Sequence, residues 1–104
     1  MKKLLLVQLR HSNEIANFHE LDSLEHISNH VHIIDNNMTN NDIRIFAEQQ
    51  AKEYYGIENF TEISEGTNGN SYFFFKMACC VSVENCVIIS ETEFNLLNKL
   101  NIIE

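Results

Sequence analysis

Residues 40–55 read NNDIRIFAEQQAKEYY, and this stretch carries the clearest helical pattern in the chain. Small and apolar residues recur along one face at helical spacing, which predicts an amphipathic helix. That face comprises Ile43, Phe46, Ala47, Gln50, Ala51 and Tyr54. Thr39 or Asn40 can cap the start of the helix, and Gly56 is expected to end it as a left-handed C-cap. Such a face must be buried against another element, and the flanking segments predict a sheet.

Two strands and a short helix are predicted on the N-terminal side of this helix. Lys3–Arg10 is a nearly continuous apolar run, which is typical of a central strand covered on both faces. Val31–Asp35 predicts a second, shorter strand. Between them, Asp22 and Glu25 form a capping box, which predicts a short helix from residue 23 to about residue 29.

A β-hairpin is predicted on the C-terminal side. Residues 59–65 and 71–82 alternate as strands do, and Asn68-Gly69-Asn70 supplies turn residues that tolerate positive φ. The register that this turn implies places Ile63 opposite Phe75. The two strands would therefore bury their aromatic residues on a shared face.

The last part of the chain predicts a turn, a strand and a helix. A tight turn near residues 84–85 leads into a strand over residues 86–89. Ser90 and Glu93 form a capping box at the start of the final helix. We expect its inward stripe to consist of Leu96, Leu97, Leu100 and Ile103.

Together these elements predict a single α+β domain over residues 1–104. We expect a mixed or antiparallel sheet of about five strands. Two main helices and one short helix would pack mainly on one face of that sheet.

The charge of the chain restricts its binding partners. Net charge is −8, and no Lys or Arg occurs between Arg10 and Arg44 or between Lys52 and Lys76. Such a surface repels phosphate, so we expect neither direct nucleic-acid binding nor binding to an anionic membrane. A basic protein surface is the natural complement.

The cysteines and the N-terminus favour a reduced, cytoplasmic setting. Cys79, Cys80 and Cys86 are too few and too close in sequence for a disulfide framework. Residues 1–7 imitate a signal peptide, but Gln8 and Arg10 interrupt the apolar run.

A candidate protein-binding surface follows the long helix. Glu53, Glu58, Glu62 and Glu65 surround the predicted helix end and the next strand, and Tyr55 falls off the core face of the helix. Only Glu62 has an expected partner, Lys76, across the predicted hairpin. We therefore predict that the acidic residues meet a basic partner and that Tyr55 is an aromatic anchor. Phe74 also falls off the predicted core face.

All five histidines, by contrast, lie in residues 11–32. His26, His30 and His32, with Asp35 after them, provide an alternative interpretation as a metal site. The spacing matches no established metal motif, so no metal or other cofactor is predicted. The sequence also has no P-loop and no nucleophile elbow, and no catalytic residue is predicted.

The leading hypothesis is a non-enzymatic protein-binding module. It would dock on a basic surface of a larger protein, such as a nucleic-acid enzyme. It resembles in type the small acidic inhibitors of phages and mobile elements, including anti-CRISPR proteins. A small metal-binding protein or metalloenzyme built on His26, His30 and His32 is one alternative. A structural subunit of a homo-oligomer is the other.

Overall fold

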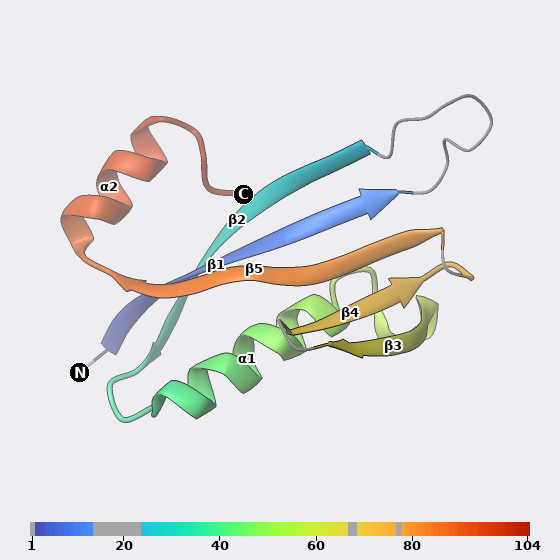
Figure 1. Cartoon of the computed structure of the whole chain (residues 1–104). Coiled ribbons are helices and arrows are strands. Elements are labelled where there is room, and N and C mark those ends of the chain that lie inside the picture. Colours follow the sequence, from blue (N-terminus) through green and yellow to red (C-terminus); the bar gives the residue numbers. More distant parts are fainter. Residues whose placement is uncertain (1, 14–23, 67–68, 77) are drawn as a thin grey trace.

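The described part of the chain forms a five-stranded antiparallel sheet with two α-helices and one 3₁₀ turn (Figure 1). The computed structural model describes residues 2–13, 24–66, 69–76 and 78–104. The strand order is β2-β1-β5-β4-β3. The elements are β1 Lys2–Asn13, β2 Leu24–Asp35, α1 Asn40–Lys52, η2 Ile57–Asn59, β3 Phe60–Gly66, β4 Gly69–Phe74, β5 Cys79–Ile89 and α2 Glu91–Lys99. The predicted α+β class is confirmed.

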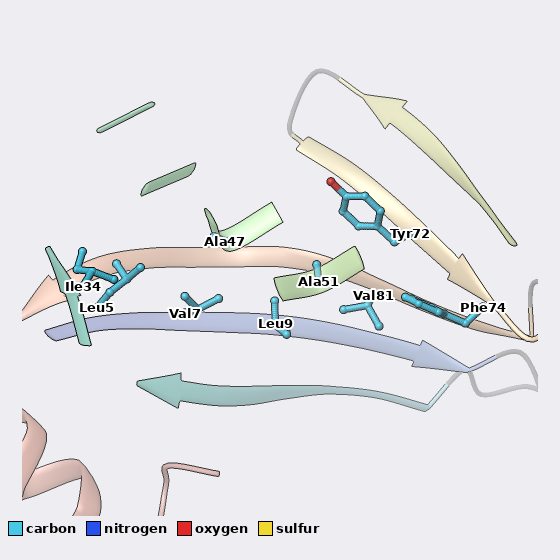
Figure 2. Packing of buried hydrophobic residues seen from close by; sticks show 9 residues of the cluster. All are labelled: Leu5, Val7, Leu9, Ile34, Ala47, Ala51, Tyr72, Phe74 and Val81. Atoms are coloured by element: carbon cyan, nitrogen blue, oxygen red, sulfur yellow. The ribbon is translucent and has the colours of Figure 1, made fainter. Parts of the chain in front are cut away.

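The strand predicted at Lys3–Arg10 is central, as its apolar run indicates. It forms most of β1, which pairs with β2 on one side and β5 on the other. Leu5, Val7 and Leu9 are almost completely buried on the face that meets α1 (Figure 2). A strand with neighbours on both sides and apolar residues on both faces stays in the interior of the sheet.

Helix α1 begins where the sequence indicates and ends earlier. Thr39 is its N-cap, and the Thr39 hydroxyl accepts a hydrogen bond from the backbone N–H of Asp42 at 3.1 Å. The small residues Ala47 and Ala51 are fully buried, which lets the helix approach the sheet closely (Figure 2). The helix ends at Lys52, so the predicted end at residue 55 and the role of Gly56 as its C-cap are wrong. Gly56 instead takes a φ of +92° ahead of η2.

The helix predicted over residues 23–29 is wrong, because Leu24–Asn29 belongs to β2. β2 pairs with β1 residue by residue, from Lys2 opposite Asp35 to Asn13 opposite Leu24. This long-range pairing outweighs the local capping signal, as tertiary context commonly does for short segments. Residue 23 and Asp22 lie outside the described residues. The strand predicted at Val31–Asp35 is present as the second half of β2.

The β3–β4 hairpin forms with a register different from the predicted one. Ile63 lies opposite Tyr72 rather than Phe75, and Gly66 lies opposite Gly69. Of the predicted turn, Asn68 lies outside the described residues, while Gly69 and Asn70 belong to β4. The shift exchanges the two faces of β4, so that Phe74 is fully buried and Phe75 is exposed.

The predicted turn at residues 84–85 is also wrong. The chain reverses after Phe74, where Phe75 and Lys76 have φ values of 55° and 58°, and β5 then continues from Cys79 to Ile89. The pairing with β1 steps from Asn85 opposite Gln8 to Val83 opposite Leu9, so Glu84 is the extra residue of a bulge. The polar residues in the middle of this strand therefore form a bulge rather than a turn.

Helix α2 starts at the predicted capping box, since the Ser90 hydroxyl accepts the Glu93 N–H at 3.1 Å. The predicted inward stripe is partly wrong, because Leu96 and Leu100 are each 57% exposed. Phe94 lines a groove with Leu4, whose side chain alternates with the buried Leu5, so α2 lies at the face opposite α1 (Figure 1). No residue of α2 is buried, so α1 provides most of the packing of helix on sheet, on one face.

Candidate functional site

The predicted acidic residues all lie at the surface near the end of α1 and along the strand that follows. Glu53 is the C-cap residue of α1, and its carboxylate accepts a hydrogen bond from the Gln49 side chain. Glu58 lies in η2, while Glu62 and Glu65 lie on β3. All of these side chains are exposed.

Glu62 and Glu65 point to opposite faces of β3. Glu62 lies opposite Phe73 and Glu65 opposite Asn70, with regular alternation between them. Glu65 is therefore on the α1 side of the sheet, where its charge contributes to raising the pKa of Tyr72. The predicted residues do not form one flat patch. Glu62 and Glu65 lie on the two faces of β3 and Glu58 lies in η2 just before it, whereas Glu53 lines a cavity over β1 and β2 with His30 and His32.

Strand β3 is itself the edge of the sheet. Its one neighbour among the described strands is β4, and six of its seven residues are exposed. The shift in register between Phe60 and Glu62 marks a bulge at Thr61. An edge strand presents a row of backbone N–H and C=O groups outside the sheet.

No ion pair between described residues balances the charge of this edge. The predicted pairing of Glu62 with Lys76 is absent, because Glu62 lies opposite Phe73. The Lys76 backbone N–H instead donates to the hydroxyl of Thr61 at 3.1 Å. The ion pairs that join described residues, Lys2–Asp35 and Arg10–Glu84, both lie elsewhere.

Tyr55 is not the freely exposed aromatic residue that the sequence indicates. Its ring is half-buried and packs edge-to-face on Phe74 at 5.2 Å and on Phe75 at 5.4 Å between ring centroids. Burial raises the pKa of its phenol. Phe75, which is 45% exposed, is the aromatic side chain at this surface that sequence reasoning missed. Because Tyr72–Phe75 are all aromatic, the sequence does not show which of these side chains is exposed.

A groove of about 280 Å³ separates the outer side of α1 from β3 and β4. The exposed Ile45 of α1 and Ile63 of β3 both line it. The Tyr72 hydroxyl donates to the Glu48 carboxylate at 2.6 Å and links the two walls of the groove. Burial and, to a smaller extent, this hydrogen bond raise the pKa of Tyr72 to about 12. The remaining lining residues are Arg44, Gln49, Lys52 and Asn70.

The alternative metal site is not formed. His26, His30 and His32 share one face of an extended strand, so the first and last are separated by about 20 Å along β2. Asp35 alternates to the other face and pairs with Lys2. Within residues 2–13, 24–66, 69–76 and 78–104, no three His, Cys, Asp or Glu side chains converge to hold a metal ion. His19 lies outside these ranges.

His11, His26 and His30 instead belong to a polar network under the end of α1. His11 Nε2 lies 2.6 Å from Ser28 Oγ, which lies 2.7 Å from His30 Nε2. His26 stacks on His11 at 4.6 Å between ring centroids, and Tyr54 contacts His11 at the same centroid distance. Ser28 and His11 are fully buried.

Burial decides the ionisation of this network. It lowers the pKa of His11 to about 4, with a further contribution from His26 and His30, whereas Glu104 acts in the opposite direction. Burial also lowers the pKa values of His30 and His32. The Ser28 hydroxyl has one proton, so one imidazole accepts it while the other donates. Ser28 and His11 are buried, so their contact links β1 to β2 inside the protein.

The comparisons with known proteins identify no relative: no family model, curated protein or solved structure matches this chain. Neither α1 nor α2, the helices of the described part, is long and apolar enough to cross a membrane.

Proposed function

We propose that this protein is a non-enzymatic binding module that uses the acidic edge around β3 to dock on a basic surface of a larger protein. The observation that supports it best is the exposed and unneutralised charge of Glu58, Glu62 and Glu65. Charges arranged in this way steer association and select the partner more than they add raw affinity.

Binding, rather than catalysis, fits the distribution of polar groups. Of the polar side chains that cluster around Ser28, Ser28 and His11 are buried. The acidic residues, by contrast, are exposed to solvent, Phe75 is exposed as well, and Ile63, between Glu62 and Glu65, lines a groove. Aromatic residues are enriched at protein interfaces, and the rim around them is polar and accessible to solvent.

The proposed partner is a nucleic-acid enzyme, because such an enzyme carries a basic groove for its own substrate. We propose that binding inhibits that enzyme, as with the small acidic inhibitors of phages and mobile elements. The charge of the edge is the basis of this proposal. We place this function in the cytoplasm, where the thiols of Cys79, Cys80 and Cys86 would stay reduced.

The test measures association with a captured partner as a function of salt. Glu58→Lys with Glu65→Lys should slow association about tenfold or more at low salt, because surface charge mainly sets the on-rate. Glu91→Lys is the matched control, since Glu91 is equally exposed but lies on α2 at the other end of the molecule (Figure 1). Equal association rates for the double variant and the control would refute the proposal, as would tight binding of nucleic acid by the protein alone.

A structural role in a homo-oligomer is the second candidate, and one observation favours it. Large aliphatic side chains are exposed away from β3, including Ile33 at 70% and both Leu96 and Leu100 on α2. Exposed apolar side chains of this size are common at contacts between subunits. Light scattering over a range of concentrations distinguishes a stable oligomer from a monomer.

A further inference from the structure

Strand β3 offers its partner a backbone edge as well as charge. It closes the sheet on one side, and its exposed residues extend over nearly its whole length. An extended segment that pairs with such an edge gains backbone hydrogen bonds, and its alternate side chains contact the two faces of the sheet. The bulge at Thr61 limits regular pairing to residues 62–66.

A second copy of this chain is a poor occupant of that edge. An antiparallel pair of β3 strands centred between Ile63 and Ser64 would place Glu62 of each copy opposite Glu65 of the other. Like charges directly opposite one another destabilise strand pairs. In this register the acidic residues disfavour self-association of the edge and favour a basic strand.

The side chains of β3 also specify the order of residues in that basic strand. Glu62 lies on one face of β3. Ile63 and Glu65 lie on the other face, because side chains alternate along a strand. In an antiparallel segment, the residues facing Glu65, Ser64, Ile63 and Glu62 follow one another in that order. Charge and polarity then require a basic residue, any residue, an apolar residue and a basic residue.

The groove beside β3 supplies the remaining contact. Ile45, at 58% exposure, stands on α1 across the groove from Ile63, and both side chains line it. This gives an apolar surface next to the position where the added strand would lie. Lys52, which also lines the groove, is held over the Phe60 ring at 5.3 Å.

We propose that the outer edge of β3 accepts an extended segment of a partner protein as a sixth strand, with the sequence basic–x–apolar–basic opposite residues 65 to 62. This inference rests on the proposed function and specifies how the partner is recognised. It assigns specificity to the backbone edge and to Ile63, in addition to the carboxylates.

The test uses synthetic ten-residue peptides with a central Lys-Thr-Val-Lys. The reference peptide should bind, and a peptide with Glu-Thr-Val-Glu should bind about tenfold or more weakly. Two further peptides carry a backbone N-methyl group at adjacent central residues. In a strand only one of these two N–H groups points to β3, so one methylation should weaken binding about tenfold and the other should not.

Hydrogen exchange locates the contact. Binding of the reference peptide should slow exchange of backbone amides within residues 62–66. The variant carrying Glu62→Lys and Glu65→Lys should reverse the preference and bind the Glu-Thr-Val-Glu peptide more tightly. Glu91→Lys should leave both affinities unchanged, since it lies on α2.

The outcomes separate this inference from the broader proposal. If the captured partner associates in a salt-dependent way through Glu58 and Glu65 but both N-methylated peptides bind as well as the reference, strand addition is wrong and the acidic docking surface stands. If neither the partner nor any basic peptide binds through these carboxylates, both are wrong. Amide protection confined to segments other than β3 would also overturn strand addition.

Discussion

The Nε2 atom of His11 lies 2.6 Å from the hydroxyl oxygen of Ser28, and this contact joins β1 to β2 inside the protein. Both residues are buried, and His11 Nδ1 has no hydrogen-bond partner among the described residues. A buried imidazole with one unpaired nitrogen resists taking up a proton, because the charge would lose the solvation that water provides. The network therefore makes stability depend on pH.

We expect stability to fall as the solution becomes acidic. The His11 pKa is about 4 in the folded protein against an ordinary value of 6.5, and the pKa values of His30 and His32 are lowered too. The unfolded chain therefore binds protons that the native state does not bind, once pH drops below about 6.5. Stability is fully present above that value and is lost between about pH 6.5 and pH 4, with His11 alone accounting for about 3 kcal/mol.

Urea unfolding at a series of pH values measures this loss. His11→Gln removes the titration and keeps a polar group, so its stability should depend less on pH over the same range. An unchanged slope in the variant would mean that other groups control the acid sensitivity.

Tyr72→Phe should destabilise the protein by about 0.5–1.5 kcal/mol, because it removes the hydrogen bond to Glu48 that joins β4 to α1. A double-mutant cycle with Glu48→Ala, which removes the acceptor, measures the coupling of the two side chains in thermal or urea unfolding. Additive effects of the two single changes would show that this contact contributes nothing to stability.

The core prediction compares two positions of contrasting burial. Phe74 is completely buried at the centre of the aromatic packing, so Phe74→Ala should cost about 3–5 kcal/mol. Ile45 faces solvent on α1, so Ile45→Ala should change stability by about 0.5 kcal/mol or less. Comparable losses at the two positions, measured by urea unfolding, would contradict the assigned faces of β4 and α1.

The parts of the fold that sequence predicted correctly depend on local signals. The caps at Thr39 and Ser90 and the apolar run of β1 are decided by residues near one another in the chain. The errors at Leu24–Asn29 and in the β3–β4 register arise from pairing between distant segments. His26, Ser28, His30 and His32 alternate as a strand does, but the capping box at Asp22 gave a competing local signal.

The candidate site was predictable in composition and not in shape. The exposure of Glu58, Glu62 and Glu65 follows from their charge. The relative position of Glu62 and Glu65 depends on the edge location of β3, which no local pattern encodes. Phe74 is buried and Phe75 exposed because the chain reverses at Phe75 and Lys76, which both have positive φ. Neither residue is a glycine, so the sequence does not mark this turn.

The final prediction concerns which aromatic residue anchors the partner. Phe75 is exposed next to the acidic edge, whereas Tyr55 is half-buried and supports both Phe74 and Phe75 from within. Phe75→Ala should therefore speed dissociation of the bound partner while leaving urea unfolding nearly unchanged, because truncating an exposed ring removes little core packing. Tyr55→Ala should lower stability, since it removes the ring that packs against both phenylalanines. Dissociation rates from surface-immobilised partner, measured beside unfolding curves for both variants, separate the two roles. Faster dissociation in Tyr55→Ala at unchanged stability, with Phe75→Ala behaving as wild type, would return the anchor to Tyr55, the position that the sequence first indicated.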